Sequence, residues 1–116
     1  MKSLMVKVVL PIILIFLFTY ASAQQNQTES RDAEFYYNRG LAYAKKGQYD
    51  QAISDYTRAL EINPRDAGAY KNRGAAYYFK REYEKSWNDV KKAQSLGYQI
   101  HPKFLDQLRK ASGRQN

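Results

Sequence analysis

Few side chains in this sequence could carry out catalysis or bind a metal ion. The chain has 116 residues, with one histidine and no cysteine. Since a zinc site takes several histidine or cysteine ligands at a fixed spacing, we expect His101, beside Pro102, to cap a helix or lie on the surface. No glycine-rich phosphate loop, nucleophile elbow or H-E-x-x-H pattern is present. The sequence therefore predicts a protein that is not an enzyme and has no catalytic residue, metal site or cofactor.

The charged residues that do recur share one interval. Asp55 and Asp89 are 34 positions apart, and so are Arg39 and Arg73. Charged side chains on a folded domain are either solvated or, where they are covered, paired with an opposite charge. We therefore expect both arginines to pair with acids of a neighbouring helix rather than to bind a ligand.

The same interval relates two octapeptides. Residues 36–43 read YYNRGLAY and residues 70–77 read YKNRGAAY. Aligning 33–66 with 67–100 gives eleven identities without a gap. Self-similarity at a fixed period of this size indicates stacked supersecondary units, each unable to bury its apolar face alone.

The apolar residues inside each unit follow a helical spacing. Tyr36, Gly40 and Tyr43 form one stripe, and a second stripe begins at Tyr49 after the Lys46-Gly47-Gln48 break. The pattern predicts helix hairpins at 33–46 with 49–62 and at 67–80 with 83–96. Gly97 is the expected stop signal of the last of these helices.

A helix hairpin of this length, with an aromatic residue, Gly, Tyr, Ala and Pro at set offsets, resembles the tetratricopeptide repeat. In the first unit, 33–66, the resemblance is carried by Tyr36, Gly40, Tyr43, Ala52, Tyr56, Ala59 and Pro64. The second unit, 67–100, keeps Tyr70, Gly74, Tyr77 and Ala93, and has Ser86, Val90 and Tyr98 in place of the usual Ala, aromatic residue and Pro. The resemblance implies an all-α fold, an α-solenoid of two helix hairpins.

These repeated residues are expected to pack the two helices of each unit. Gly40 and Gly74 have no side chain, so the facing helix can approach closely through Ala52 or Ser86. A larger residue at Gly40 is expected to cost about 1–3 kcal/mol through overpacking.

A fifth helix is expected at 101–112. It places Phe104, Leu105, Leu108 and Ala111 on one face, with Pro102 in the first turn. A terminal helix that is apolar on one face and charged on the other can close the end of a solenoid, so we interpret it as a C-terminal capping helix. Residues 113–116 are expected to be a disordered tail.

The resemblance also implies a binding surface. In tetratricopeptide repeats the helix face opposite the packing stripe lines a concave groove that meets a peptide or protein. The corresponding positions here are Tyr37, Asn38, Leu41, Lys45, Lys71, Asn72, Ala75, Tyr78 and Phe79. Asn38 and Asn72 have the donors and acceptors to pair with an extended backbone, and the two lysines attract an acidic side chain or a C-terminal carboxylate. Two alternatives stay open: the asparagines bond a neighbouring helix, or Tyr78 and Phe79 lie under the capping helix.

The N-terminal 23 residues have the features of a secretory signal peptide. Lys2 and Lys7 precede a 13-residue apolar run at 8–20, and Ala21-Ser22-Ala23 offers a cleavage site. A membrane anchor needs about 20 apolar residues, so we expect cleavage after Ala23 and no stable membrane span thereafter. Residues 24–32 are polar and are expected to be a flexible tail. The mature protein would be periplasmic or secreted.

The amino-acid composition indicates a basic protein. The chain has 19 Lys and Arg against 11 Asp and Glu, a net charge of +8. Export argues against nucleic acid, so the expected function is a non-catalytic interaction module that binds another protein or peptide, with acidic segments favoured. Alternatives are a structural part of an envelope assembly that uses its outer helix faces, or an anionic-surface binder through Lys80, Arg81, Lys85, Lys91 and Lys92. Because about three repeats are usually needed for stability, we also expect marginal stability or homo-oligomer formation.

Overall fold

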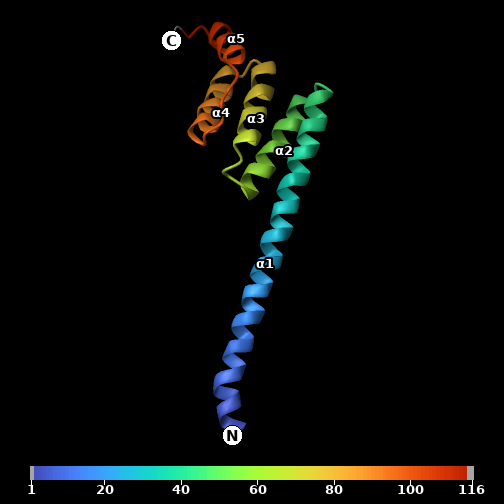
Figure 1. The fold of residues 1–116 in the computed structure, drawn as a ribbon. Coiled ribbons are helices and arrows are strands. Elements are labelled where there is room, and N and C mark those ends of the chain that lie inside the picture. The colour runs from blue at the N-terminus through green and yellow to red at the C-terminus, as the bar shows by residue number, and fades with distance from the viewer. Residues whose placement is uncertain (1, 115–116) are drawn as a thin grey trace. The chain divides into compact units, whose positions relative to one another are not determined.

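The computed structural model describes residues 2–114 of the chain. This range contains five α-helices and no strand, as the sequence predicts (Figure 1). The helices are α1 (Lys2–Lys45), α2 (Tyr49–Ile62), α3 (Ala67–Phe79), α4 (Tyr83–Ser95) and α5 (Pro102–Ser112). The chain divides into two compact units after Arg31, and the two are described separately.

The N-terminal unit consists of helix alone. Its large apolar side chains between Leu4 and Tyr20 are exposed. The helix is long and apolar enough to cross a membrane, with an 18-residue window of mean hydropathy 2.4 near the N-terminus. A signal sequence near the N-terminus passes the same test of length and hydropathy, so this helix is compatible with one.

The expected flexible tail, residues 24–32, is helical instead. The sequence has no glycine or proline between Pro11 and Gly40, so nothing in it interrupts a helix here. The Thr28 hydroxyl donates to the Gln24 carbonyl at 3.0 Å, within one helical turn. Polar composition alone predicted the tail wrongly, because polar residues such as Gln, Glu and Arg are also good helix formers.

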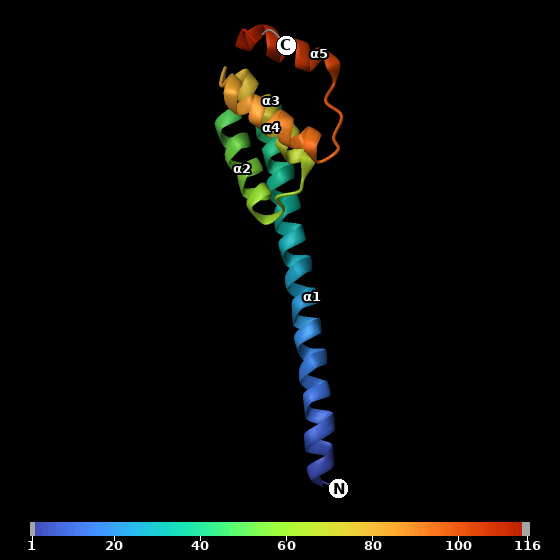
Figure 2. The ribbon, with the colours of Figure 1, turned by 90° about the vertical axis from the view of Figure 1, so that its left-hand side faces the viewer.

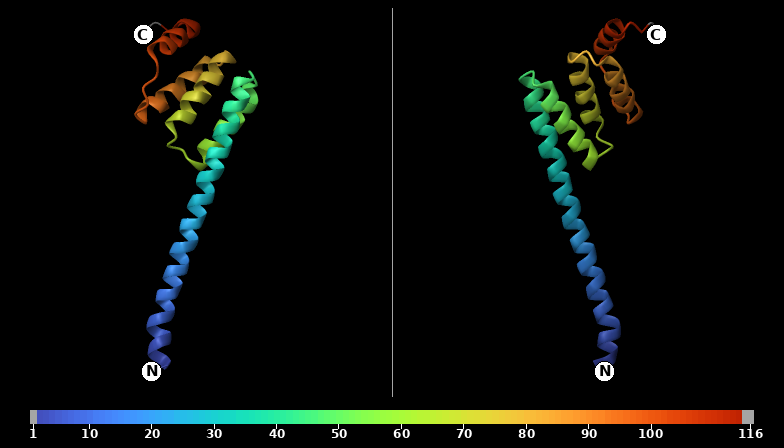
Figure 3. Two further views of the ribbon diagram at one scale, coloured as in Figure 1. Left: turned by 45° about the vertical axis from the view of Figure 1, so that its right-hand side comes forward. Right: turned by 180° about the vertical axis from the view of Figure 1, so that it is seen from behind.

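The second unit contains residues 32–45 of α1 together with α2 to α5, and it is built from two helix hairpins. Residues 32–45 pair with α2, and α3 pairs with α4 (Figures 1 and 2). Helix α2 has the expected bounds, and α3 and α4 each end one residue earlier than expected. The hairpins stack side by side, so the α-solenoid is confirmed (Figure 3).

Each hairpin closes tightly at its glycine, although by different contacts. A Cβ placed on Gly40 would lie 2.8 Å from Cε1 of Tyr56, so the aromatic ring, and not Ala52, is the close neighbour. A Cβ on Gly74 would lie 3.3 Å from the carbonyl oxygen of Ser86. The buried Ser86 hydroxyl donates to the Gly74 carbonyl at 2.7 Å, which explains why a serine can stand where this repeat usually has alanine.

The other residues expected to pack the repeats lie at several depths. Pro64 is exposed, because it stands in the turn between α2 and α3 and shapes that turn without entering the core. The tyrosines of the first stripe, Tyr36, Tyr43, Tyr70 and Tyr77, are half-buried. The buried ones are Ala52, Tyr56, Ala59, Val90 and Ala93.

Helix α5 closes the C-terminal end of the solenoid. Leu108 is fully buried and packs with Trp87, Val90, Ala93 and Ile100. The Trp87 indole N–H donates to the Ser112 hydroxyl at 3.0 Å, which joins the end of α5 to α4. Ala111, expected on the inner face, is exposed. The capping helix is therefore present, and its buried contact centres on one leucine.

The residues after α5 are more ordered than a disordered tail. Gly113 has a φ of 70° and ends the helix in the left-handed conformation. Arg114 forms an ion pair with Glu84, and its guanidinium lies 5.3 Å from the Trp87 ring centroid. Residues 115–116 lie outside the described range. Arg114 thus contacts α4 through Glu84 and Trp87, and sequence position alone does not indicate these contacts.

Candidate functional site

The predicted groove residues come from two helices of the second unit. Residues 32–45 of α1 contribute Tyr37, Asn38, Leu41 and Lys45, and α3 contributes Lys71, Asn72, Ala75, Tyr78 and Phe79. The four α3 residues other than Asn72 line a hollow of about 380 Å³ that faces α5. The complete lining is Lys71, Ala75, Tyr78, Phe79, Ile100, His101, Phe104 and Gln107, and we call it the α3–α5 hollow.

Half of this lining was not predicted as a binding surface. Ile100 and His101 belong to the segment between α4 and α5, and Phe104 and Gln107 belong to α5. The sequence marks Phe104 as apolar, so it was assigned to the core face of the capping helix. In the structure Phe104 is half-buried and contributes to both the core and the hollow.

His101 has the structural role expected of it. Its Nδ1 accepts a hydrogen bond from the Lys103 backbone N–H at 3.1 Å, which caps the first turn of α5. The side chain satisfies one of the free N–H groups at the start of a helix. Its ring also forms part of the wall of the hollow.

Tyr78 and Phe79 are adjacent in sequence but have different environments. The Tyr78 ring packs on Phe104, with centroids 5.4 Å apart, and on Tyr83 at 5.9 Å, so it lies under α5. Phe79 is 59% exposed and stacks on Tyr49 with an interplanar angle of 11°. Tyr78 is therefore a wall of the hollow, and Phe79 presents an aromatic face to solvent.

The two asparagines also differ. The Asn72 amide donates to the Tyr37 hydroxyl at 2.9 Å, and this bond joins α3 to α1. Burial and the charge of Asp66 raise the pKa of Tyr37, so its hydroxyl stays protonated. Asn38 is exposed. For Asn72 the structure therefore agrees with the alternative in which the amide bonds a neighbouring helix.

The remaining predicted groove residues are a lysine on each helix and an apolar pair. Lys71 is half-buried at the rim of the hollow and has no ion pair among residues 2–114. Lys45 is exposed at the end of α1, and Leu41 and Ala75 are half-buried. A single cation beside an apolar surface can attract an acidic group while the surface holds an apolar side chain.

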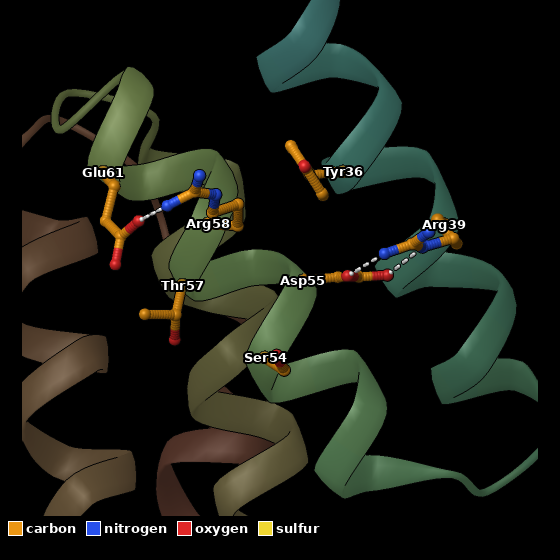
Figure 4. Close-up of a pocket in the computed structure, with 7 residues that line it drawn as sticks. All are labelled: Tyr36, Arg39, Ser54, Asp55, Thr57, Arg58 and Glu61. Carbon is orange, nitrogen blue, oxygen red and sulfur yellow. Dashed lines mark hydrogen bonds and ion pairs between the residues drawn. The ribbon is translucent and has the colours of Figure 1, made fainter.

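The repeated arginines form structural ion pairs, as predicted. Arg39 binds Asp55 through two hydrogen bonds of 2.7 and 2.8 Å (Figure 4). Arg73 binds Asp89 through two hydrogen bonds of 2.8 Å and also donates to the Thr57 hydroxyl at 3.0 Å. Hydrogen bonding to these carboxylates raises the pKa of both arginines, so both remain charged. Each bidentate pair joins the two helices of one hairpin.

A second hollow of about 330 Å³ lies beside the first of these pairs (Figure 4). It is lined by Tyr36 and Arg39 of α1 and by Ser54, Asp55, Thr57, Arg58 and Glu61 of α2. Arg58 donates to Glu61 at 2.8 Å across one turn of α2. This hollow contains charged groups already paired with each other, and it was not predicted from the sequence.

The basic residues that the sequence groups together are partly neutralised by ion pairs; they are Lys80, Arg81, Lys85, Lys91 and Lys92. Lys80 forms ion pairs with Asp50 and Glu82, and Lys85 pairs with Glu82 at 2.7 Å. Paired charges on a surface produce a weaker field than free ones, which reduces the attraction to an anionic surface. Across the described range there is also no group of three His, Cys, Asp or Glu side chains that could hold a metal ion.

Comparison with known proteins agrees with this geometry. Residues 33–66, the first hairpin, match the family model of the tetratricopeptide repeat. A search of curated proteins found no match. Domains of this family are typically non-catalytic scaffolds that bind other proteins or peptides. The chain therefore contains a tetratricopeptide repeat at 33–66, followed by a second helix hairpin and a closing helix, and such a repeat indicates in general terms a protein–protein interaction module.

Proposed function

We propose that this protein is an exported, non-catalytic module that holds a peptide segment of another protein in the α3–α5 hollow. The observation that carries the proposal is the hollow itself, about 380 Å³ lined by aromatic side chains and one lysine. A pocket of this kind is apolar with few polar groups, and those groups set the orientation of the ligand. The volume suits one or two side chains of a peptide.

Each lining residue has a role in this proposal. Phe79 and Phe104 contact an apolar side chain of the peptide, because rigid aromatic rings lose little entropy on binding. Lys71 attracts an acidic side chain or the C-terminal carboxylate. Gln107 is exposed at the rim and offers both a donor and an acceptor to the peptide backbone. Asn38, exposed on α1, contacts a peptide that extends beyond the hollow.

The proposal of export rests on the N-terminal unit. Two lysines, an apolar run and Ala21-Ser22-Ala23 precede the domain, and the helix that contains them is compatible with a signal sequence. Mass spectrometry of the protein recovered from cells tests this point. A mature N-terminus at Gln24 in the periplasmic or secreted fraction supports export, and an intact N-terminus in the membrane fraction supports retention as an anchor.

Site-specific cross-linking tests the binding site directly. A photoreactive p-benzoyl-phenylalanine in place of Gln107 would lie at the rim of the hollow. The same group in place of Gln94, exposed on α4, provides the matched control. We expect one defined protein to cross-link at position 107 and not at 94, and peptide mapping of the adduct identifies the bound segment.

Two charge reversals then separate the hollow from the outer faces. Lys71→Glu should weaken binding of the mapped segment at least about tenfold, because an attraction becomes a repulsion. Lys91→Glu makes the same charge change on the exposed surface of α4 and should leave binding unchanged. Equal effects of the two reversals, or cross-linking at position 94 alone, would assign binding to the outer faces and contradict the proposal.

A further inference from the structure

The two repeats differ in what covers the arginine of the octapeptide. Arg73 has a side chain that is 17% exposed, because α2 packs over it and Thr57 accepts a hydrogen bond from its Nη1. Arg39 stands at the equivalent position of the first repeat and is 46% exposed. Within residues 2–114 its Nη1 has no hydrogen-bond partner. Within residues 32–114 the first repeat thus has no helix in the place that α2 takes beside the second.

The residues around Arg39 show the same contrast. Phe35 is 56% exposed, and its equivalent in the second repeat, Ala69, is fully buried. The Arg39 guanidinium lies 5.1 Å from the Phe35 ring centroid and 5.5 Å from that of Tyr36. The hollow of about 330 Å³ between α1 and α2 opens beside this arginine (Figure 4). We call the surface formed by Phe35, Tyr36, Arg39, Ser54 and Arg58 the N-terminal face.

We propose that the N-terminal face binds an α-helix of a partner protein that presents Ser, Thr, Asp or Glu against Arg39, as α2 presents Thr57 against Arg73. The second repeat supplies the template, because there α2 covers Arg73, the equivalent of Arg39, and accepts a hydrogen bond from it through Thr57. This site is separate from the α3–α5 hollow and does not depend on its function.

The chemistry of the face favours a helix rich in oxygen acceptors. Two guanidinium groups, those of Arg39 and Arg58, have more N–H donors than their carboxylate partners can accept. Helix α2, which covers the equivalent face, carries three acids and one arginine in Tyr49–Ile62. The α2 side chain that accepts from Arg73 is Thr57, so an oxygen acceptor at that position describes the partner helix.

A second copy of this chain fits the face less well. Its C-terminal helices are basic, since α4 carries three lysines and two acids and α5 carries three basic residues and one acid. Two copies joined through their N-terminal faces would place arginines against arginines, which is unfavourable. We therefore assign the face to a different protein.

The probe for this site is a synthetic helix with the sequence of α2, residues 49–62. A 14-residue peptide forms little helix in water, so a staple joins its positions 51 and 58, which are exposed in α2. A fluorescent label on the peptide reports binding by anisotropy. The protein is the chain from residue 24 onward, which keeps the whole second unit with its own core.

Two arginine substitutions form a matched pair. Ser54→Arg fills the hollow beside Arg39 and should exclude the probe by its bulk, an effect opposite to that of its positive charge, which alone would attract an acidic probe. Asn88→Arg makes the equivalent change on α4, at the same place in the second repeat and away from the hollow. We expect saturable binding of the probe, weakened about tenfold or more by Ser54→Arg and unchanged by Asn88→Arg. A probe with Thr57→Val, which lacks the acceptor, should bind about three- to tenfold more weakly.

Three results would overturn the proposal. The first is no saturable binding, and the second is equal binding by the Ser54→Arg and Asn88→Arg proteins. The third is a dimer in sedimentation equilibrium that Ser54→Arg dissociates, which would assign the face to a second copy. Circular dichroism of both variants confirms that a loss of binding is not a loss of fold.

Discussion

The close contact at Gly40 gives a prediction whose magnitude differs between the two repeats. An alanine Cβ at position 40 would lie 2.8 and 2.9 Å from two ring carbons of Tyr56, well inside the 3.4 Å at which ordinary contact begins. Tyr56 is 1% exposed, so its ring has no free space into which it can move. At Gly74 the nearest atoms are at 3.2 and 3.3 Å, a misfit that small shifts of α4 can absorb.

The magnitude follows from two opposing contributions. Overpacking a core costs about 1–3 kcal/mol, and replacing glycine by alanine inside a helix returns about 1 kcal/mol. The contacts at Gly40 are below 3.0 Å, so its overpacking lies in the upper part of this range, about 2–3 kcal/mol, and Gly40→Ala should lower the free energy of unfolding by about 1–2 kcal/mol. Gly74→Ala should change it by less than about 0.5 kcal/mol.

Urea unfolding of the chain from residue 24 onward measures both changes by far-UV circular dichroism. A Tyr56→Leu background supplies the control, because removing the ring should abolish the extra cost of Gly40→Ala in a double-mutant cycle. The reasoning is refuted if Gly40→Ala is neutral or stabilising, or if its cost persists unchanged without the ring. Equal costs at the two glycines would also contradict it.

Three further predictions follow from the contacts between and within the repeats. Arg73→Ala should cost about 2–4 kcal/mol in urea unfolding, because it leaves the buried Asp89 unpaired and also removes the bond to Thr57. Arg39→Ala should cost less, because Arg39 is the more exposed arginine; a larger cost at position 39 would contradict this. Arg81 has a φ of 64°, so Arg81→Gly should raise the free energy of unfolding by up to about 1 kcal/mol, and a loss of stability would show that the arginine side chain compensates for the strain. Hydrogen bonds from Lys80 and Lys85 lower the pKa of Glu82 to about 2. The stabilisation of the folded state by these bonds is therefore present above the usual glutamate pKa, and it is lost as the pH falls toward 2. NMR titration of the Glu82 carboxyl should show a midpoint near this pKa in the unmodified protein and a higher midpoint in Lys80→Ala. An unchanged midpoint in the variant would mean that Lys80 does not lower the pKa of Glu82.

Sequence periodicity was sufficient to predict the elements of the second unit. Helical spacing and the Gly47 and Pro64 turns predicted the helix bounds to within one or two residues in α2 to α5. The repeated Arg39 and Arg73 also predicted ion pairs with acids of a neighbouring helix, and in the structure Arg39 pairs with Asp55 of α2. These features are predictable because they depend on contacts within one repeat, and the sequence contains two copies of that repeat.

Contacts between repeats and with the capping helix were not predictable in the same way. The bond from Asn72 to Tyr37 depends on how far one hairpin is rotated against the next, and no spacing in the sequence records that rotation. The position of Phe104 over Tyr78 depends on the segment 96–101 between α4 and α5, which is longer than the turn between α2 and α3. The α3–α5 hollow depends on the position of α5 and therefore could not be predicted from the repeat pattern.

The differences between equivalent residues arise from position in the stack. Gly47 and Arg81 lie in equivalent turns of the two repeats and both have a positive φ, yet only position 47 carries a glycine, the residue that this conformation favours. Arg39 and Arg73 make the same carboxylate pair, and only the second is covered by a preceding helix. A repeat with neighbours on both sides can tolerate a strained turn, because the contacts on either side hold its backbone in place. The first repeat has one neighbour within residues 32–114 and keeps the family residues most completely. Its uncovered arginine is then the surface at which the stack can continue, with a helix from another protein.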